Sequence, residues 1–496
     1  MKSERSSGIL LHITSLPGPY GIGTLGKEAF DFVDFLVSAG QKIWQILPLG
    51  HTGYGDSPYQ CFSAFAGNPL LIDLDKLQAE GLLSSNELPK TTVHNLDEVD
   101  FGLVYTYKYP LLRKAYERFK ANNNRVKQMQ HENFVAKSKY WLEDYAFFMA
   151  IKNHYSGKAW TEWDAEVKMR DLKTLEELKE KLTDEIGFYR FLQFVFFRQW
   201  LEVKAYANLN DIKIIGDIPL YVASDSADAW SNPDIFDFDH DLNPITVAGV
   251  PPDYFSETGQ LWGNPIYNWE ALKNDGFQWW VERVKANLVI YDVLRIDHFR
   301  GLAAYWAVPF GEPTAIRGEW IKAPGMELLD ALYEALGTPP IIAEDLGVIT
   351  PDVIELRDGF GLPGMKILQF AFDSAEENEF MPHTFDKNCV VYTGTHDNDT
   401  TLGQFKSVKE ADRQLMKKYF DVNETDPAWS FVKLAWSSVA ATAIAPMQDL
   451  LRLGSEARMN FPGKPSGYWK WRYQKDMLKP CHAEELLELT KLYGRR

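Results

Sequence analysis

The chain has 496 residues, 45% of them hydrophobic and 24% charged, which is ordinary for a globular protein with one very large domain or a few smaller ones. Its net charge of −17 would repel phosphates, and this argues against nucleic acid or an anionic membrane surface as a partner. Aromatic residues are in excess at 14%, and their rings either fill a large core or stack on the apolar faces of sugars.

The start of the chain contains only a short apolar run, "GILLHI", before polar residues and proline. This pattern predicts neither a secretory signal nor a membrane anchor. The cysteines at 61, 389 and 481 are widely spaced and form no CxxC pair, so we expect neither a disulfide framework nor a zinc site. We therefore expect a cytoplasmic protein that uses no metal ion and no cofactor.

Eight short apolar runs alternate with segments of helical periodicity and predict a parallel sheet built from βα units. The runs span 8–13, 42–49, 212–220, 291–297, 340–345, 365–372, 389–397 and 442–449. Between the first two runs, residues 27–40 place apolar side chains at helical spacing, and Gly40 is a suitable stop. We predict an α/β fold, a closed (β/α)8 TIM barrel, in a single domain over residues 1–496.

Two gaps between the runs are too long for one barrel helix. Residues 76–190, after the second run, carry Lys, Glu and aromatic residues at helical spacing and predict a helical insertion that forms a subdomain at the carboxyl-end face of the barrel. Residues 222–276, after the third run, are rich in Asp, Asn, Pro, Gly and aromatic residues and predict a loop-rich insertion. Long loops in a compact domain usually serve function.

Within the second insertion, Asp237, Asp239 and Asp241 alternate as calcium ligands do. The glycine and the distal glutamate of an EF-hand loop are missing from this stretch. We therefore interpret it as a solvated loop rather than as a calcium site.

Acidic residues end several of the predicted strands. They are Asp217, Asp297, Glu344 and Asp397. A single acid at a strand end is usually a helix cap or a surface group, but active sites of (β/α)8 enzymes lie at the carboxyl ends of the strands. Because side chains alternate along a strand, Glu344 faces the same way as Ile342, and Asp345 faces the other way. Four acids that converge on one pocket predict an active site, with Glu344 as a member.

Several carboxylates beside an arginine, in a pocket with aromatic walls, suit the cleavage of a glycosidic bond. That reaction needs one ionised carboxylate and one protonated carboxylic acid. Arg295 beside Asp297 predicts that Asp297 is ionised, while Glu344, with less compensating charge, is predicted to keep its proton. His298 and His396 are candidates for hydrogen bonds to sugar hydroxyls, or else they are structural histidines at the barrel rim.

These segments resemble the motifs of the 4-α-glucanotransferases called amylomaltases or disproportionating enzymes, glycoside hydrolase family 77 of the α-amylase clan. The resemblance is carried by "IIGDIPLYV", "VLRIDHFRG", "IIAEDLG" and "TGTHDN", and it extends through "GILLHITSLPGPYGIGTLG", "GYGDSPYQCFSAFAGNP", "GVPPDYFSETGQLWGNPIYNW" and "ARMNFPG". It implies retaining transfer of an α-1,4-glucan segment, through a covalent glycosyl-enzyme, to the 4-hydroxyl of another glucan or of glucose. The implied substrates are maltooligosaccharides, amylose, starch or glycogen.

The resemblance also implies roles for individual residues. Asp297 corresponds to the nucleophile, Glu344 to the general acid/base, and Asp397 to the carboxylate that grips and distorts the sugar at the cleavage point. The implied contacts to sugar are Ser57, Tyr59, Asp217, Trp262, Arg295, His396 and Asn460. Tyr254 and Phe255 match paired aromatics over the acceptor side, whereas Tyr267 and Trp269 in the same loop are more typical of packing.

Two residues depart from the family pattern: His51 stands where we expect proline, and Tyr468 stands where we expect asparagine. Both residues are expected to affect only the shape of their own loops, and neither is one of the three catalytic acids Asp297, Glu344 and Asp397. Two alternatives remain open. An α-glucan hydrolase of the same clan would pass the glycosyl group to water, and a non-catalytic glucan-binding protein would tolerate amides at 297 and 344.

Overall fold

The computed structural model describes residues 5–53, 55–89, 96–122, 124–252, 256–372, 378–464 and 466–495. Eight parallel strands form one sheet in the order β10-β11-β12-β1-β2-β3-β6-β9. They are β1 (Ser6–Leu10), β2 (Ile43–Gln45), β3 (Lys213–Ile218), β6 (Val293–Ile296), β9 (Ile341–Ala343), β10 (Gly364–Ile367), β11 (Cys389–Tyr392) and β12 (Thr442–Pro446).

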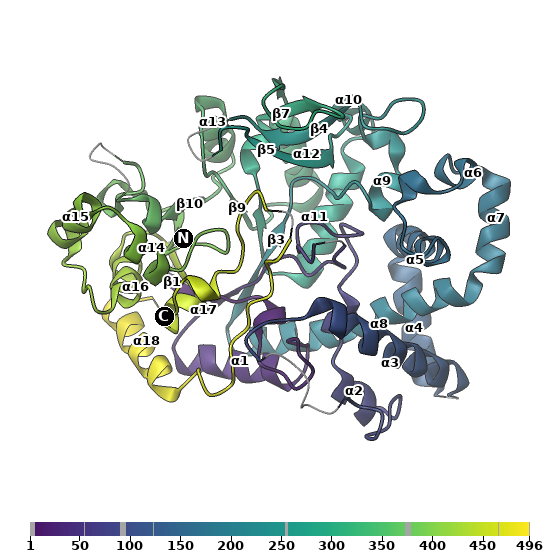
Figure 1. Cartoon of the computed structure of the whole chain (residues 1–496), viewed down its shortest axis with the longest axis horizontal. Helices are drawn as coiled ribbons and strands as arrows, with labels where there is room; N and C mark the ends of the chain where they lie inside the picture. Colours follow the sequence, from purple (N-terminus) through teal and green to yellow (C-terminus); the bar gives the residue numbers. More distant parts are fainter. Residues whose placement is uncertain are drawn as a thin grey trace.

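The two edge strands of this sheet come together and nearly close it into a barrel. The Ala343 N–H at the end of β9 donates to the Pro363 carbonyl, just before β10, at 2.9 Å. Each of the eight apolar runs predicted from the sequence overlaps one barrel strand, so the predicted (β/α)8 architecture is confirmed (Figure 1). The strands are shorter than the runs, because residues that follow a strand, such as Leu47, Leu49 and Leu220, are also buried and apolar.

The chain between β2 and β3 is mostly helical. Its helices are α2 (Leu74–Ala79), α3 (Phe101–Ala121), α4 (Arg125–Lys137), α5 (Lys139–His154), α6 (Ala165–Lys168), α7 (Leu172–Lys181) and α8 (Thr183–Leu209). Figure 1 shows α3 to α7 on one side of the barrel, while α8 returns the chain to β3. Side chains of α8 therefore link this helical segment to the barrel wall.

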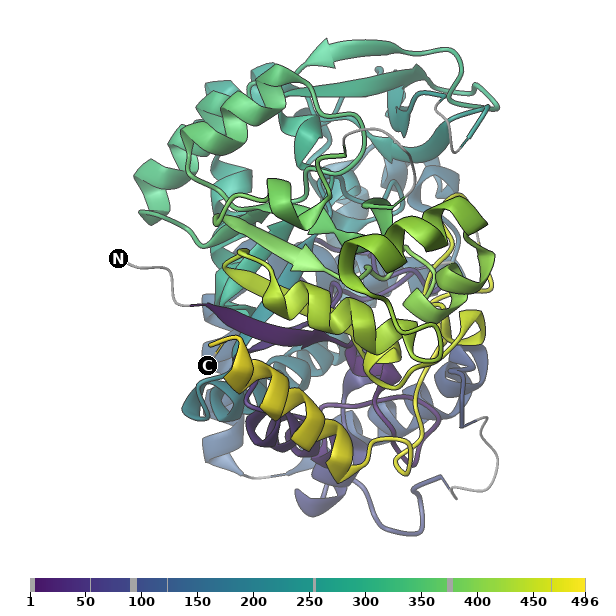
Figure 2. The ribbon, with the colours of Figure 1, turned by 90° about the vertical axis from the view of Figure 1, so that its left-hand side faces the viewer.

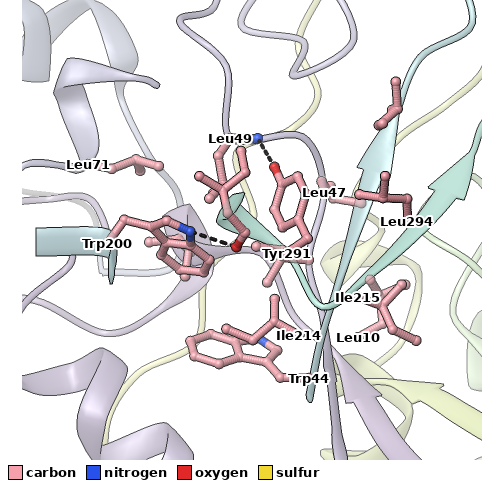
Figure 3. Packing of buried hydrophobic residues seen from close by; sticks show 14 of the residues in the cluster. Leu10, Trp44, Leu47, Leu49, Leu71, Trp200, Ile214, Ile215, Tyr291 and Leu294 are labelled. Atoms are coloured by element: carbon pink, nitrogen blue, oxygen red, sulfur yellow. Dashed lines mark hydrogen bonds between the residues drawn. The ribbon is translucent and has the colours of Figure 1, made fainter. Parts of the chain in front are cut away.

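The core between α8 and the barrel wall is built from large aromatic and aliphatic side chains (Figure 3). Trp200 of α8 and Trp44 of β2 are fully buried, and the Trp200 indole N–H donates to the Ile290 carbonyl at 2.9 Å. The Tyr291 hydroxyl accepts from the Leu49 N–H at 3.2 Å, so these buried rings keep their polar atoms paired. This packing fixes strands β3 and β6, which carry candidate site residues.

A second, antiparallel sheet has the strand order β5-β4-β7-β8. Its strands are β4 (Thr246–Val250), β5 (Gln260–Pro265), β7 (Ala304–Pro309) and β8 (Glu319–Lys322). It lies at the top of the view in Figure 1. This sheet was not expected from the sequence, because its strands are short and three of them, β4, β5 and β7, contain Gly or Pro. Strand β7 begins just after the 3-10 turn Phe299–Leu302, which follows Asp297.

The remaining helices are α1 (Lys27–Ser38), α9 (Ala227–Ser231), α10 (Trp269–Asn274), α11 (Gln278–Ile290), α12 (Gly325–Leu336), α13 (Pro351–Gly359), α14 (Thr401–Ser407), α15 (Glu410–Phe420), α16 (Pro427–Ser437), α17 (Met447–Leu450) and α18 (Pro480–Leu492). Figure 2 shows α18 alongside β1, and Arg495 donates to the Ser6 carbonyl at 3.0 Å. All three cysteines are free. Within the described ranges, no helix has the length and apolar character needed to cross a membrane.

Candidate active site

The four acids predicted at strand ends lie at the carboxyl-end side of the barrel, but not all directly after a strand. Asp297 and Glu344 immediately follow β6 and β9. Asp217 lies within β3, and Asp397 lies in the loop after β11. In this loop the Asn398 side chain accepts from the Thr395 N–H at 2.8 Å, across the turn that contains Asp397.

Arg295 is shared by two carboxylates. Asp217 and Arg295 stand opposite each other in the β3–β6 pairing, and Arg295 Nη1 contacts the two Asp217 carboxylate oxygens at 2.8 and 2.6 Å. The same nitrogen lies 2.9 Å from Asp297 Oδ1. Both Arg295 and Asp217 are buried, and a buried charge is tolerated only when it is paired and hydrogen-bonded. The site is thus built around one guanidinium between two acids.

Tyr59 joins this cluster from the loop after β2. Its hydroxyl donates to Asp217 Oδ2 at 2.7 Å and lies 2.9 Å from His396 Nε2. The Tyr59 and His396 rings are stacked with centroids 5.3 Å apart, and Trp469 packs against both rings. Ser57 accepts from the Tyr59 N–H at 3.2 Å, so in this structure Ser57 shapes the turn that presents Tyr59.

Asp397 is held by the carboxyl-terminal part of the chain. Asn460 Nδ2 donates to Asp397 Oδ1 at 2.7 Å, and Arg458 donates to the Asp397 carbonyl at 2.7 Å. Asp397 Oδ2 lies 3.5 Å from His396 Nε2. The Asp397 side chain is 42% exposed, so its carboxylate is open to a ligand.

Glu344 is held by backbone groups rather than by a cation. Its Oε2 accepts from the His298 N–H at 2.6 Å, and its Oε1 accepts from the Leu346 N–H at 2.9 Å. Asp345 points away from it and accepts from the Met365 N–H and from Arg357. The predicted alternation between Glu344 and Asp345 is therefore confirmed.

Burial is the largest cause of the pKa shifts of Asp297 and Glu344. It raises the pKa of Glu344, and the nearby Asp297 charge raises it further, in line with the predicted protonated Glu344. Burial also raises the pKa of Asp297, although Arg295 opposes the rise. The guanidinium is divided between Asp297 and the fully buried Asp217, and the ionised state of Asp297 stays a prediction.

His298 and Trp262 form the side of the site next to the second sheet. His298 has a positive φ of 54°, a strained backbone conformation for a non-glycine residue, and its ring meets the Trp262 ring edge-on at 4.7 Å. Burial lowers the pKa of His298 to about 3 and also lowers the pKa of His396. Both histidines are neutral at pH 7, so each can donate one hydrogen bond and accept another.

Sequence reasoning did not assign roles to Arg458 and Trp469, although "ARMNFPG" and "SGYWKWR" contain them. Two features of the sequence could have indicated them: Arg458 lies two residues before Asn460, and Trp469 lies two residues after Gly467. Tyr254 and Phe255 lie outside the described residues. Tyr267 is buried, and its hydroxyl donates to the Leu220 carbonyl at 2.9 Å, so it packs the loop onto the barrel.

The stretch with alternating aspartates forms a turn. Asp239 Oδ1 accepts from the N–H groups of Asp241 and Asn243, each at 2.9 Å. In the part of the chain that the structure describes, no group of three or more His, Cys, Asp or Glu side chains is arranged to hold a metal ion. The carboxylate of Asp239 therefore serves the backbone of its own loop.

The two departures from the family pattern lie outside the carboxylate cluster. His51 is buried, with Nδ1 2.8 Å from the Tyr145 hydroxyl and Nε2 2.9 Å from the Tyr109 hydroxyl. The histidine thus joins the loop after β2 to helices α3 and α5. Tyr468 packs against Phe461, with ring centroids 6.0 Å apart.

Comparison with known proteins agrees with this geometry. The 4-alpha-glucanotransferase family model, glycoside hydrolase family 77, matches residues 11–478. A 4-alpha-glucanotransferase from Synechocystis is 51% identical and one from Thermus thermophilus is 49% identical; the matches cover 100% of this chain and 99% and 100% of those relatives. A solved structure, an amylomaltase from Streptococcus agalactiae in complex with acarbose, is 42% identical with a TM-score of 0.96, over 99% of this chain and 100% of that one. The chain therefore belongs to the 4-alpha-glucanotransferase family.

Proposed function

We propose that this chain is a retaining 4-α-glucanotransferase, with Asp297 as the nucleophile and Glu344 as the general acid/base. The observation that carries this assignment is the difference between their partners. Asp297 is paired with the Arg295 guanidinium, whereas the partners of Glu344 among the described residues are the backbone N–H groups of His298 and Leu346. Two carboxyl groups with different partners lose their protons in sequence, and Asp297 does so first.

In the first half-reaction, an Asp297 carboxylate oxygen attacks the anomeric carbon of an α-1,4-glucan. The bond from that carbon to the leaving 4-oxygen breaks, and Glu344 gives its proton to this oxygen. The shortened glucan leaves with a free 4-hydroxyl. The remaining segment is joined to Asp297 as a glycosyl ester.

In the second half-reaction, the 4-hydroxyl of another glucan, or of glucose, gives its proton to the Glu344 carboxylate. Its oxygen attacks the anomeric carbon, and the ester bond to Asp297 breaks. Glu344 is again protonated and Asp297 is again ionised. The scheme uses no cofactor, because the two carboxyl groups supply the nucleophile and the proton.

The side chains around Asp297 supply the contacts for the sugar at the cleavage point. We assign this role to Asp217, Arg295, Tyr59, His396, Asp397 and Asn460, with Trp262 and His298 on the neighbouring wall and Ser57 behind Tyr59. Tyr254 and Phe255 remain proposed acceptor contacts. The related amylomaltase from Streptococcus agalactiae binds acarbose, and we expect acarbose to compete with maltooligosaccharides here.

The proposed substrates are uncharged α-1,4-glucans such as maltooligosaccharides, amylose, starch or glycogen. A net charge of −17 does not oppose the approach of such chains, whereas it would oppose nucleic acid or an anionic membrane. The proposal therefore places the protein in the metabolism of storage glucans and maltodextrins.

Incubation with maltotriose tests the proposal. Transfer gives glucose and a ladder of longer glucans while the number of reducing ends stays constant. A steady rise in reducing ends would instead assign the chain to the glucan hydrolases. Binding of maltotriose without any change in chain length would overturn the enzymatic proposal altogether.

A further inference from the structure

The loops that follow β6 and β9 are joined at Glu344. The Glu344 N–H donates to the Ile296 carbonyl at 3.1 Å, and the Phe299 N–H donates to the Glu344 carbonyl at 3.1 Å. The His298 N–H reaches the Glu344 side chain. These contacts fix the Glu344 backbone and one of its carboxylate oxygens. The other oxygen depends on the Leu346 N–H, which belongs to the loop that continues after Glu344.

Arg300 makes the next connection between the same two loops. It lies in the 3-10 turn Phe299–Leu302, and its Nη1 donates to the Val348 carbonyl. Val348 is exposed, and Gly347 before it has a φ of +86°, so the loop does not fix its own position by burying side chains there. Leu346 packs against the core, so the Arg300 hydrogen bond holds the loop where that packing ends, at Gly347 and Val348.

Arg300 is itself held in place from the second sheet. Arg300 is 7% exposed, and its guanidinium lies 4.1 Å from the centre of the Trp320 ring on β8. Asp352, at the start of α13, adds an attractive charge, while burial lowers the pKa of Arg300. A guanidinium stacked on an indole keeps its plane and direction, which a flexible ammonium does not.

We propose that Arg300, supported by Trp320, is a positioning residue that sets the orientation of Glu344 through the loop 346–348. This inference rests on the proposed function of Glu344 as the general acid. Arg300 does not contact Glu344, so it acts through the Val348 carbonyl and the Leu346 N–H. Proton transfer requires close alignment of the acid with the leaving oxygen, and displacement of about 1 Å can cost about 100-fold in rate.

The test compares two donors that differ in their need for a proton. Maltotriose needs Glu344 to protonate its leaving oxygen, whereas α-maltosyl fluoride releases fluoride with little proton help. The measured quantity is the ratio of kcat/KM for maltotriose to kcat/KM for the fluoride, which reports the covalent step in a ping-pong reaction. Because both values come from one preparation, the ratio does not depend on the folded fraction.

We compare three variants, at Glu344, Arg300 and Trp320, with one control variant at Arg495. Glu344→Gln removes the acid and sets the largest possible fall in the ratio. For Arg300→Gln we expect a fall of about 10- to 100-fold, and for Trp320→Leu a smaller fall, since Trp320 is 44% exposed and its loss leaves the arginine in place. The control is Arg495→Gln, another buried arginine that donates to backbone carbonyls, at the start of β1.

The outcomes separate the inference from the function on which it rests. A fall in the ratio for Glu344→Gln and Arg300→Gln, with no fall for Arg495→Gln, supports the positioning role. If Glu344→Gln lowers the ratio but Arg300→Gln lowers both rates equally, Arg300 is a structural residue only and the inference is overturned. If Glu344→Gln itself leaves the ratio unchanged, Glu344 is not the acid, and the proposed function falls together with the role of Arg300.

Discussion

The Tyr59 hydroxyl bridges Asp217 and His396, at 2.7 Å from Asp217 Oδ2 and 2.9 Å from His396 Nε2. A phenol has one proton, and the buried Asp217 carboxylate is the stronger acceptor, so Tyr59 donates to Asp217. His396 Nε2 must then carry a proton and donate to Tyr59. This fixes the tautomer of the neutral His396 and leaves no lone pair on Nε2 facing the carboxylates.

Replacement of this hydroxyl tests its importance for the site. Tyr59→Phe leaves Asp217 with one hydrogen bond fewer and His396 without its acceptor, while the stacked ring remains. We expect kcat/KM on maltotriose to fall by about 10- to 100-fold, from about 1.5–3 kcal/mol for a hydrogen bond to a charged group. Tyr392→Phe is the matched control, because Tyr392 donates to Gln45 at 2.8 Å. An equal fall for both variants would contradict a specific role of Tyr59.

Asp297→Asn keeps the shape of the nucleophile and removes its charge. We expect turnover of maltotriose to be lost while the fold and the binding of acarbose, measured by calorimetry, are retained. Asp345→Asn is the control, since Asp345 is a buried acid in the neighbouring loop after β9 that pairs with Arg357 instead. It should lower stability but keep turnover per folded molecule. Wild-type turnover by Asp297→Asn would remove Asp297 from the mechanism.

The raised pKa of Glu344 makes stability depend on pH. Burial raises the pKa in the folded state to about 8, so between the ordinary glutamate pKa and about 8 the folded chain binds a proton that the unfolded chain does not. Stability from this group is full at low pH and is lost as the pH rises through that window. Glu344→Gln carries no charge at any pH and should be more stable than wild type at pH 8, with the difference shrinking toward pH 4. Urea unfolding at both pH values measures it, and a difference that does not change with pH would contradict the shift.

Much of the barrel and the site could be predicted from local sequence, because both follow short-range rules. Apolar runs mark parallel strands buried on both faces, and the alternation that separates Glu344 from Asp345 is a property of any strand. The loops at Asp297 and Glu344 begin where the runs end. These features need no knowledge of distant contacts.

The parts that escaped prediction depend on distant contacts. That Arg295 is shared between Asp297 and Asp217 could not be read from local sequence, because only the β3–β6 pairing brings Asp217 beside it. Arg458 and Trp469 reach the site only because the carboxyl-terminal loop folds back beside β11 and the loop after β2. The second sheet pairs strands from either side of β6, so no single stretch of sequence contains its pattern.

His51 provides a stability test away from the carboxylates. His51→Phe keeps an aromatic ring but leaves the hydroxyls of Tyr109 and Tyr145 without this partner. The Tyr145 hydroxyl keeps its hydrogen bond from Gln193 Nε2 at 3.2 Å, so we expect the cost of lost hydrogen bonds, about 0.5–1.5 kcal/mol of the free energy of unfolding for each. His240→Phe is the control, because the His240 side chain is 89% exposed and a surface change should cost less than about 0.5 kcal/mol. Equal urea midpoints for wild type and His51→Phe would show that the network does not stabilise the loop.

Asn460 tests the orientation of Asp397 with a pair of variants. Asn460 Nδ2 donates to Asp397 Oδ1 at 2.7 Å, so Asn460→Ala frees the carboxylate to rotate. We expect kcat/KM on maltotriose to fall by about tenfold, as for the loss of one hydrogen bond to a charged group. Asn460→Asp is nearly the same size but places a second carboxylate beside Asp397, and like charges at that distance repel. Its activity at pH 7 should fall below that of Asn460→Ala.

The repulsion between Asp397 and the new carboxylate should also make the rate of Asn460→Asp depend on pH. As the pH falls, the new carboxyl group at position 460 takes up a proton, which removes the repulsion and lets it donate a hydrogen bond to Asp397. The rate of Asn460→Asp, divided by the wild-type rate at each pH, should therefore rise between pH 7 and pH 5. The same ratio for Asn460→Ala should stay flat, because alanine has no proton to bind. Parallel profiles for the two variants would mean that Asn460 does not orient Asp397 through this hydrogen bond.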